Sequence, residues 1–379
     1  MIEALMAGSK ALVVGFAALT IKNIIMIMVG SLLLYLGIKK DYEPLLLVPI
    51  GFGAILVNIP LSGLMDQHGL LRQFYEVGVL TEVFPCLIFI GIGAMTDFGP
   101  LLQNPRILLL GAAGQFGIFL TLLLALALGF SKLDAVAIGI IGACDGPTSI
   151  YVTSQYAPHL LGAVSVAAYS YMSLVPLIQP PIMRILTTEK ERKVVMEYPT
   201  KSVSKELKIV FPIIVTLITC IIAPMGTPLM GMIMLGNLMR ESGVVGRLTK
   251  ASENEITNVV TLFLGLSIGA TMEGGAFLKT QTILILALGF LAIALDTVTG
   301  VLFGKLMCFL TKGKVNPLIG AAGISAYPMA ARVVQNEGRK YDPNNWLLMH
   351  AIGANTGGQI GSVMAAAIML SVLKGLGMG

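Results

Sequence analysis

Hydrophobic residues form long uninterrupted runs along this chain, and polar residues gather in short breaks between the runs. An α-helix needs ~20 apolar residues to cross ~30 Å of hydrocarbon. Four uncharged runs exceed that length, and they cover 107–130, 160–183, 209–239 and 346–373. With the shorter runs, the pattern predicts roughly ten to twelve hydrophobic segments, several of them broken. We therefore expect an all-α polytopic membrane protein, with residues 1–379 as a single integral membrane domain.

Composition agrees with this expectation. The chain is 56% hydrophobic and 12% charged, whereas soluble domains carry about 25% charged residues. Glu3 and the lack of a basic stretch before the first apolar run predict that no cleaved signal peptide is present. No separate soluble domain is expected, so water-soluble chemistry has to come from partner proteins.

Positive charge is concentrated in one polar connector rather than in a nucleic-acid-binding surface. Residues 184–208 hold seven basic side chains against four acidic ones. Basic loops tend to remain in the cytoplasm, so we expect a cytoplasmic connector and no nucleic-acid partner. The connector also divides the chain into two parts.

The two parts resemble each other. "FIGIGAMTDFGPLLQNPRILLLGAAGQFGIF", from Phe89, and "FLGLSIGATMEGGAFLKTQTILILALGFLAIAL", from Phe263, both run from a glycine-rich helix end through a polar turn into an apolar helix. Further on, "GIIGACDGPTSIYV" (139–152) aligns with "GAAGISAYPMAARV" (320–333) and shares its glycine and proline positions. The pattern predicts an internal repeat.

We place the first repeat half at 76–188 and the second at 258–375, with a charged connector and helical hairpin at 189–257 between them. An apolar segment that is interrupted by Gly and Pro in both halves is the sequence signature of a transporter's central site. Backbone groups freed by such a break are tolerated only inside protein or along a wet cavity.

Asp145 is the strongest candidate for chemistry in these segments. It precedes Gly146 and Pro147 within an apolar run. A charge at the bilayer centre costs at least ~2.5–3.5 kcal/mol, and such residues usually mark ion or proton paths. The structural alternative is a buried ion pair or a helix cap. The hydroxyl of Thr148 is a further oxygen that a hard cation such as Na⁺ accepts.

The matching segment of the second half adds Asn316, Ser325 and Arg332. Asn and Ser supply neutral oxygens, and Arg supplies a permanent positive charge that suits an anionic group. The alternative for Arg332 is that its side chain extends to the membrane surface. We expect this segment to lie opposite Asp145.

Other polar residues in apolar surroundings are less decisive. Tyr169 and Tyr171 point to different faces of a helix, and the pattern alone does not choose between them. Asn355 is a polar group in a glycine-rich run. For Asp296 we expect a structural contact, with hydroxyl groups of the neighbouring threonines as its partners. Asp97 is expected to cap a helix that begins near Pro100.

Several motifs together are similar to those of a known family. "GAMTDFGPLL", "GACDGPTSIYV", "AAYSYMSLVPLIQPPIMRILTTEKER", "MLGNLMRESGVV", "NPLIGAAGISAYPMAARV" and "NWLLMHAIGANTGG" resemble segments of the β subunits of sodium-translocating biotin-dependent decarboxylases. That family serves oxaloacetate, methylmalonyl-CoA, glutaconyl-CoA and malonate decarboxylases. The resemblance covers about residues 25–375, and "GACDGP" departs from it mildly, at Cys144.

The resemblance implies a fold, a reaction and partners. The fold would be an elevator-like transporter with inverted repeats and broken helices. The protein would decarboxylate carboxybiotin and couple CO₂ release and proton uptake to Na⁺ export. It would act in the bacterial cytoplasmic (inner) membrane with an α carboxyltransferase subunit, a biotin carrier protein and a small γ membrane subunit, as a homotrimer of β. Substrate recognition would belong to the α subunit.

The resemblance also assigns roles to residues. It places the functional aspartate at Asp145 and the tyrosine at Tyr171, and with Arg332 these form the expected catalytic set. Arg332 and Asn355 are expected to bind carboxybiotin. The expected Na⁺ ligands are Asp145, Asn316 and Ser325, with Thr148 as a secondary ligand.

A Na⁺-coupled secondary transporter of organic anions that acts alone is the competing hypothesis. Repeats, broken helices and an intramembrane Arg fit it equally well. A purely structural membrane anchor has no reason to keep Asp145 and Arg332 within lipid.

Overall fold

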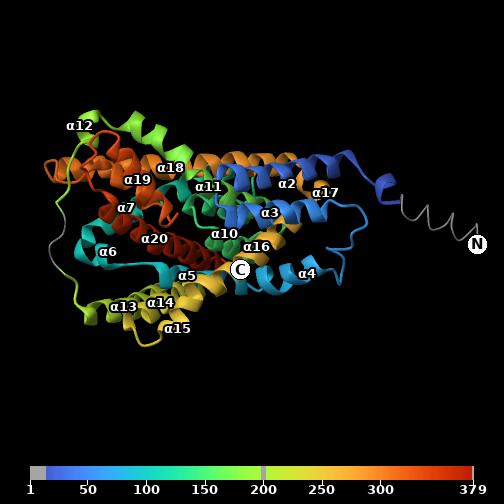
Figure 1. The fold of residues 1–379 in the computed structure, drawn as a ribbon, viewed down its shortest axis with the longest axis horizontal. Coiled ribbons are helices and arrows are strands. Elements are labelled where there is room, and N and C mark those ends of the chain that lie inside the picture. The colour runs from blue at the N-terminus through green and yellow to red at the C-terminus, as the bar shows by residue number, and fades with distance from the viewer. Residues whose placement is uncertain (1–13, 198–201, 378–379) are drawn as a thin grey trace, which may run out of the picture.

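The structure is a computed structural model that describes residues 14–197 and 202–377 (Figure 1). All regular elements in this part of the chain are helices. The prediction that no signal peptide is present concerns residues 1–13, which lie outside the described residues. The prediction of an all-α protein is therefore confirmed for the described chain.

Helices before the connector include several that are short or interrupted. Their bounds are α2 (Ile21–Lys40), α3 (Pro44–Val57), α4 (Leu70–Phe74), η1 (Tyr75–Leu80), α5 (Val83–Met95), α6 (Gly99–Gln103), η2 (Pro105–Ile107), α7 (Leu108–Ala113), α8 (Phe116–Ala127), α9 (Lys132–Gly139), η3 (Ile140–Ala143), α10 (Gly146–Tyr156), η4 (Pro158–Leu160) and α11 (Leu161–Leu186). The N-cap residue of α6 is Phe98 rather than Asp97, although Asp97 accepts a hydrogen bond from Gly99 N at 2.8 Å.

The connector carries α12 (Glu189–Arg192), and a second series of helices follows it. Their bounds are α13 (Lys205–Ile222), η5 (Pro224–Gly226), α14 (Thr227–Ser242), α15 (Gly246–Ala251), η6 (Ser252–Ile256), α16 (Thr257–Ala270), α17 (Gly274–Phe277), α18 (Thr280–Leu310), η7 (Pro317–Gly323), α19 (Met329–Arg339) and α20 (Leu348–Gly375). The predicted hairpin between the halves is the α13–α14 pair.

The order of elements in α2–α11 recurs in α13–α20. Each series has a hairpin, a short helix that passes into a π-helical turn, an apolar helix, a four- or five-residue helix, a long apolar segment, a broken segment and a final long helix. The two short helices α6 and α17, which occupy matching places in the series, lie at opposite ends of the molecule (Figure 1).

Packing between the series is reciprocal. α3 of the first hairpin packs on α16, and α14 of the second hairpin packs on α5. Each interface depends on glycines that face backbone: Gly53 and Gly269 in the first, Gly93 and Gly236 in the second. A Cβ at any of these positions would overlap a carbonyl oxygen of the facing helix. Small residues at such crossings allow close approach of helices, which is how membrane helices associate.

The helices form two packed groups. One contains the hairpins α2–α3 and α13–α14 with α5 and α16. The other contains the segments from α7 to α11 and from α18 to α20, in which α18 packs on α11, α8 and η7, and α20 packs on α7. Both broken segments lie in the second group. The first group contacts the second through α5 on α10, α16 on α11 and η5 on α20.

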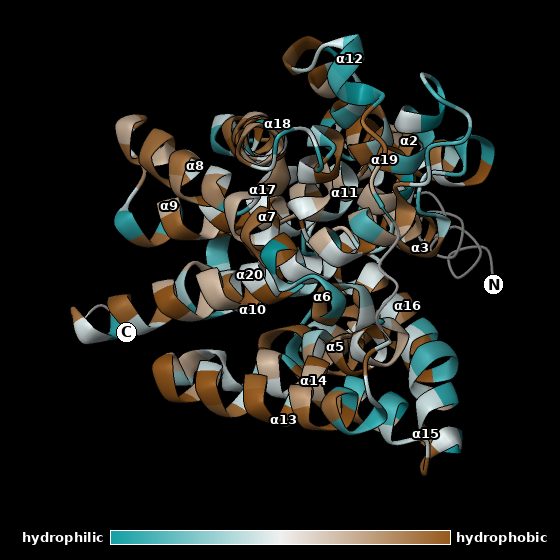
Figure 2. Ribbon diagram, turned by 90° about the vertical axis from the view of Figure 1, so that its left-hand side faces the viewer, coloured by the Kyte–Doolittle hydropathy of each residue, from teal (hydrophilic) through white to brown (hydrophobic). Residues whose placement is uncertain are grey.

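The outer surface is suited to lipid. Among the residues that the structure describes, five helical segments are long and apolar enough to span a membrane: Ile21–Lys40, Pro105–Ala127, Pro158–Leu186, Thr280–Leu310 and Leu348–Gly375. A sixth is the pair Leu70–Leu80 and Val83–Met95, bent by 61°. α13 exposes a row of aliphatic side chains that includes Ile214, Leu217 and Ile221, and Figure 2 shows it mainly brown, unlike the teal α12. The protein is thus a multi-pass membrane protein.

Ion pairs outside the apolar segments attach the connector end of α11 to α19. The carboxylate of Glu337 is almost completely buried and accepts hydrogen bonds from Arg184 Nε (2.5 Å) and Nη2 (2.9 Å), and from Lys340 Nζ (2.9 Å). Burial raises the pKa of Glu337, but these hydrogen bonds outweigh it and hold the pKa below the ordinary value of 4.5. The carboxylate therefore stabilises the fold only while it is ionised.

We predict that Glu337→Gln lowers the free energy of unfolding by about 2 kcal/mol, because hydrogen bonds to charged partners are weakened. Since the folded-state pKa is depressed, this contribution is present above pH 4.5 and is lost as the pH falls through the folded-state value. The measurement is Tm of purified protein at pH 7 and near pH 4. The exposed Glu189→Gln, which removes the pair with Lys193, is the matched control and should not change Tm. Equal Tm losses for the two variants would contradict the assignment.

Candidate functional site

The first helix break lies between η3 and α10. Cys144 has a left-handed backbone (φ 54°), and Asp145 is extended (φ −134°, ψ 100°). Pro147 sits in the first turn of α10, where its missing N–H leaves no intrahelical bond unmade. The residues Cys144 and Asp145, here called the first break, therefore interrupt the helical path at the position expected from the Gly-Pro pair.

Asp145 is buried at this break, with 6% of its surface exposed. Its carboxylate accepts hydrogen bonds from the hydroxyls of Thr148 (2.6 Å) and Ser362 (3.3 Å), and it caps α10 through Thr148 N (3.5 Å). Within the described chain, no Lys, Arg or His forms an ion pair with it. The cap expected as the structural alternative is present. It leaves a buried carboxylate whose partners are hydroxyl groups and one backbone amide.

The second break comprises residues 324–328, between η7 and α19. Ser325 lies in it, and its backbone N–H donates to Ala143 O at 3.2 Å, two residues before Asp145. The hydroxyl of Ser325 donates to Gly358 O of α20 at 2.8 Å. The two breaks are thus in direct contact, and Ser325 is the residue of the second half that lies next to the first break.

α20 carries a row of buried polar side chains past both breaks. Asn355 donates its amide to Ile324 O at 2.6 Å, while its Oδ1 has no partner among the described residues. Gln359 and Ser362 follow at intervals of four and three residues, on the same helix face. Only Asn355 was selected from the sequence. The spacing of Asn355, Gln359 and Ser362 along an apolar helix is the sequence signal that indicates the other two.

The structure distinguishes the two candidate tyrosines. The ring of Tyr169 packs against the backbone of Gly146, so closely that a Cβ there would overlap it. Its hydroxyl is buried and has no partner among the described residues. Tyr171 points elsewhere: its hydroxyl donates to Leu286 O at 2.7 Å, and its ring lies edge-on to Phe290. Tyr169 is therefore the tyrosine beside Asp145.

Asn316 is not brought to Asp145. It begins η7, where its Oδ1 accepts from Leu318 N (2.9 Å) and its amide donates to Arg192 O (3.0 Å) and Val194 O (2.8 Å) of the connector. Ser325 follows at the other end of η7. Seven residues of 3₁₀-helix span about 14 Å, so Asn316 holds the connector while Ser325 contacts the first break.

Arg332 lies on an exposed face of α19. Its charged neighbour is Glu43, at the turn between α2 and α3, and Tyr327 of the second break is also close. The guanidinium is therefore open to water and does not neutralise the Asp145 carboxylate. This exposed position agrees with the alternative interpretation of Arg332, in which its side chain extends to the surface. It leaves Arg332 accessible to an anion from solution.

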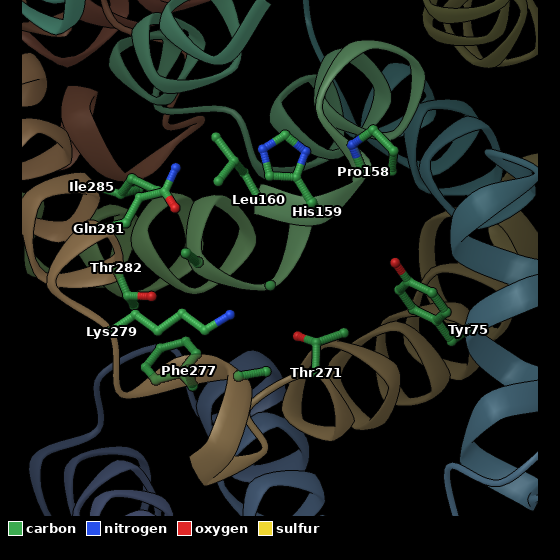
Figure 3. A pocket seen from close by; sticks show the side chains of 13 residues that line it. Tyr75, Pro158, His159, Leu160, Thr271, Phe277, Lys279, Gln281, Thr282 and Ile285 are labelled. Atoms are coloured by element: carbon green, nitrogen blue, oxygen red, sulfur yellow. The ribbon is translucent and has the colours of Figure 1, made fainter. Parts of the chain in front are cut away.

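Two cavities lie away from the breaks. One, of about 200 Å³, is bounded by η4, α17 and the start of α18. Figure 3 shows His159, Thr271 and Lys279 around it, with Tyr75 on a separate helix. The other, of about 290 Å³, lies beside the connector and is lined by Arg106 and Lys314 among others. Asp145 lines neither cavity, so the candidate ion site is closed to both in this conformation.

Comparisons with known proteins agree with this arrangement. Residues 22–373 match the family described as the Na⁺-transporting oxaloacetate decarboxylase beta subunit. The chain is 55% identical to the methylmalonyl-CoA decarboxylase subunit beta of Veillonella parvula, with 95% of each protein covered. It is 54% identical to the glutaconyl-CoA decarboxylase subunit beta of Acidaminococcus fermentans, with 95% of this chain and 96% of that protein covered.

A more distant relative is the oxaloacetate decarboxylase beta chain of Haemophilus ducreyi, which is 47% identical, with 95% of this chain and 97% of that protein covered. The relatives thus extend over nearly the whole of both broken segments and the hairpins around them. From the extent of these matches, together with a buried carboxylate where two broken membrane helices meet, the chain belongs to the family of Na⁺-transporting oxaloacetate decarboxylase beta subunits.

Proposed function

We propose that this protein is the membrane subunit of a Na⁺-pumping decarboxylase, which decarboxylates carboxybiotin and uses that reaction to export Na⁺. The observation that carries the proposal is Asp145, a buried carboxylate without a cationic partner at the contact of two broken helices. Family membership supplies the reaction. Relatives named for methylmalonyl-CoA, glutaconyl-CoA and oxaloacetate all match, so the carboxylic acid substrate remains open.

The Na⁺ site is proposed to lie at the first break. Na⁺ is a hard cation that takes oxygen ligands, and the oxygens present are the carboxylate of Asp145 and the hydroxyls of Thr148 and Ser362. Ser325 keeps lone pairs on its hydroxyl, because that group acts as a donor to Gly358 O. The unpartnered Oδ1 of Asn355 is a further oxygen on the neighbouring helix. For Asn316, the contacts favour a role in holding the connector.

Carboxybiotin is proposed to bind at the connector end. There Arg332 is exposed and suits the carboxylate of the ligand. In the reaction the bond between nitrogen and the carboxyl carbon breaks, CO₂ leaves, and the electron pair remains on nitrogen, which takes up one proton. Tyr171 is the proton donor expected from the family resemblance. Asn355, also expected to bind carboxybiotin, lies deeper, at the second break, and fits the ion site better.

Transport is proposed to follow from two inverted repeats and an elevator-like movement. The recurring element order, the reciprocal hairpin packing and the placement of α6 and α17 at opposite ends support this inference. The group with the broken helices would move against the group with the hairpins. Ligands shift such an equilibrium only by binding one state better than the other. Occupation of Asp145 by Na⁺ would supply that difference.

The proposed assembly comprises a homotrimer of this chain with an α carboxyltransferase subunit, a biotin carrier protein and a small γ subunit in the bacterial inner membrane. The names of the relatives as β subunits support a multisubunit complex. A secondary transporter that acts alone would pump without a biotin carrier. Blocking the biotin of the reconstituted complex with avidin separates the two, because only the decarboxylase would then stop transporting Na⁺.

We predict that Asp145→Asn in the assembled complex lowers Na⁺-dependent decarboxylation of carboxybiotin by more than about 100-fold, since a charged ligand of the ion is lost. Carboxyl transfer to biotin should remain intact. The measurement is CO₂ release and ²²Na⁺ uptake in proteoliposomes. Asp66→Asn, at an exposed position, is the control and should behave as wild type. Full pumping by Asp145→Asn would refute the proposed site.

A second prediction separates the two tyrosines. Tyr169→Phe should raise the Na⁺ concentration for half-maximal activity about 10-fold, because the removed hydroxyl lies beside the break. Tyr171→Phe should instead lower the rate at saturating Na⁺ with little change in Na⁺ dependence. Activity measured as a function of Na⁺ concentration for both variants tests this. An unchanged Na⁺ dependence in Tyr169→Phe would remove Tyr169 from the ion site.

A further inference from the structure

Asp296 is a second buried acid near the first break. It lies in the middle of α18 with none of its surface exposed. The partners expected from the sequence are wrong, because the hydroxyls of Thr297 and Thr299 donate to the backbone oxygens of Ile293 (2.9 Å) and Asp296 (3.1 Å). The carboxyl group of Asp296 therefore faces other parts of the protein.

One carboxyl oxygen of Asp296 is bonded, and the other is not. Oδ1 accepts a hydrogen bond from Gly117 N at 2.6 Å, at the start of α8. Oδ2 is buried without a partner among the described residues. It faces η3: a Cβ built on Gly142 would lie 2.7 Å from it. An unpaired buried carboxylate is strongly disfavoured, so Oδ2 is where a cation would compensate the charge.

Beside the second broken segment, the neutral side chain of Gln115 makes a contact that corresponds to the one that Asp296 makes beside the first. In the alignment of the two halves Gly142 matches Gly323. Gln115 Nε2 approaches Gly323 by donating to its carbonyl at 3.0 Å, and it also donates to Gly358 O at 3.3 Å. Beside the second broken segment an amide therefore joins the helices. Beside the first broken segment, the corresponding position is occupied by Asp296, which has no counter-ion among the described residues.

The surroundings of Asp296 hold few titratable groups. From the first break, Cys144 lies near Asp296, and Asp145 is its neighbour in the chain. α11 contributes Tyr169 at the break and Tyr171, which packs on α18 through Phe290. α7, α8 and η7 carry no titratable side chain, and α9 carries Lys132 and Asp134, the latter paired with His159. Arg184 of α11 and Lys305 of α18 are engaged with Glu337 and Glu191.

We propose that Asp296 is the proton-binding carboxyl group of the pump: Oδ2 carries a proton while the site at Asp145 is empty and releases it when Na⁺ binds there. The inference rests on the proposed Na⁺ site and extends it. Oδ2 of Asp296 faces Gly142, three residues before Asp145, and the intervening Cys144 lies near both carboxyl groups. Two neighbouring acids in a dry interior do not ionise together, because like charges oppose each other.

Na⁺ at Asp145 relieves that repulsion. With Asp145 neutralised by the ion, Asp296 can lose its proton, and the anion that remains is held by the N-terminus of α8. When Na⁺ leaves, the carboxylate of Asp145 regains its charge and Asp296 takes up a proton again. The exchange is one Na⁺ for one proton, and it creates the reciprocal coupling that a pump requires.

The test is proton release on Na⁺ binding to the purified complex in nanodiscs. Isothermal titration calorimetry in buffers of different ionisation enthalpy gives the number of protons released for each Na⁺. We expect proton release in wild type and its loss in Asp296→Asn, which keeps the oxygen that accepts from Gly117 N. Asp296→Asn should still bind Na⁺, with an affinity that no longer depends on pH. Wild-type proton release in Asp296→Asn would overturn the proposal.

Two further measurements keep the test decisive. Infrared difference spectra of wild type alone should lose a protonated-carboxyl band when Na⁺ is added, so the proposal does not depend on a variant that folds. No change in that band would overturn it. If Asp296→Asn binds fewer Na⁺ ions while the remaining ions still release protons, Asp296 is a Na⁺ ligand and the proton assignment fails.

The matched control is Asp145→Asn, which should abolish Na⁺ binding itself. If instead Asp145→Asn binds Na⁺ normally, the proposed function of Asp145 fails. Failure of the Asp296 proposal gives a different result. In that case Asp145→Asn still abolishes Na⁺ binding, but Asp296→Asn still releases protons.

Discussion

The constraint on which this structure depends is that every backbone group freed by a helix break inside the membrane needs a partner within the protein. Two segments break here and share partners: Ser325 N of the second donates to Ala143 O of the first, and α20 accepts the hydroxyl of Ser325 and donates the amide of Asn355 to the second break. These bonds hold the two broken segments side by side. That contact places polar groups from both parts of the chain around Asp145.

Three of the buried polar atoms that lack a partner lie near the two breaks. Oδ1 of Asn355, the hydroxyl of Tyr169 and Oδ2 of Asp296 are buried without partners among the described residues. A buried polar group without a hydrogen bond is unfavourable by about 1–3 kcal/mol, so an ion or proton that uses these atoms gains binding energy that the ion-free protein lacks. Charges that serve the fold behave differently, as at Glu337, where the carboxylate is fully paired.

Helix packing separates the residues that lie near the connector from those that lie at the first break. Asn316 and Arg332 belong to the same segment as Ser325, but η7 places Asn316 at the connector, and Arg332 lies on an exposed face of α19, one turn after the break and near Glu43. A segment that links a water-exposed surface to the proposed ion site is suited to join a reaction in water to transport. The other packed group consists of the hairpins, α5 and α16, which pack on one another through reciprocal glycine contacts.

Sequence patterns alone were enough to predict the helical membrane architecture, the broken segments and the position of Asp145 at one of them, because hydropathy and Gly-Pro breaks are local properties of the chain. The sequence also provided the family, through motifs spread over the whole length. It did not determine which side chains meet. Tyr169 rather than Tyr171 lies at the break, Asn316 binds the connector, and Gly117 rather than a threonine binds Asp296. These contacts join residues far apart in the chain, and only the packing of helices against one another sets their rotation and depth.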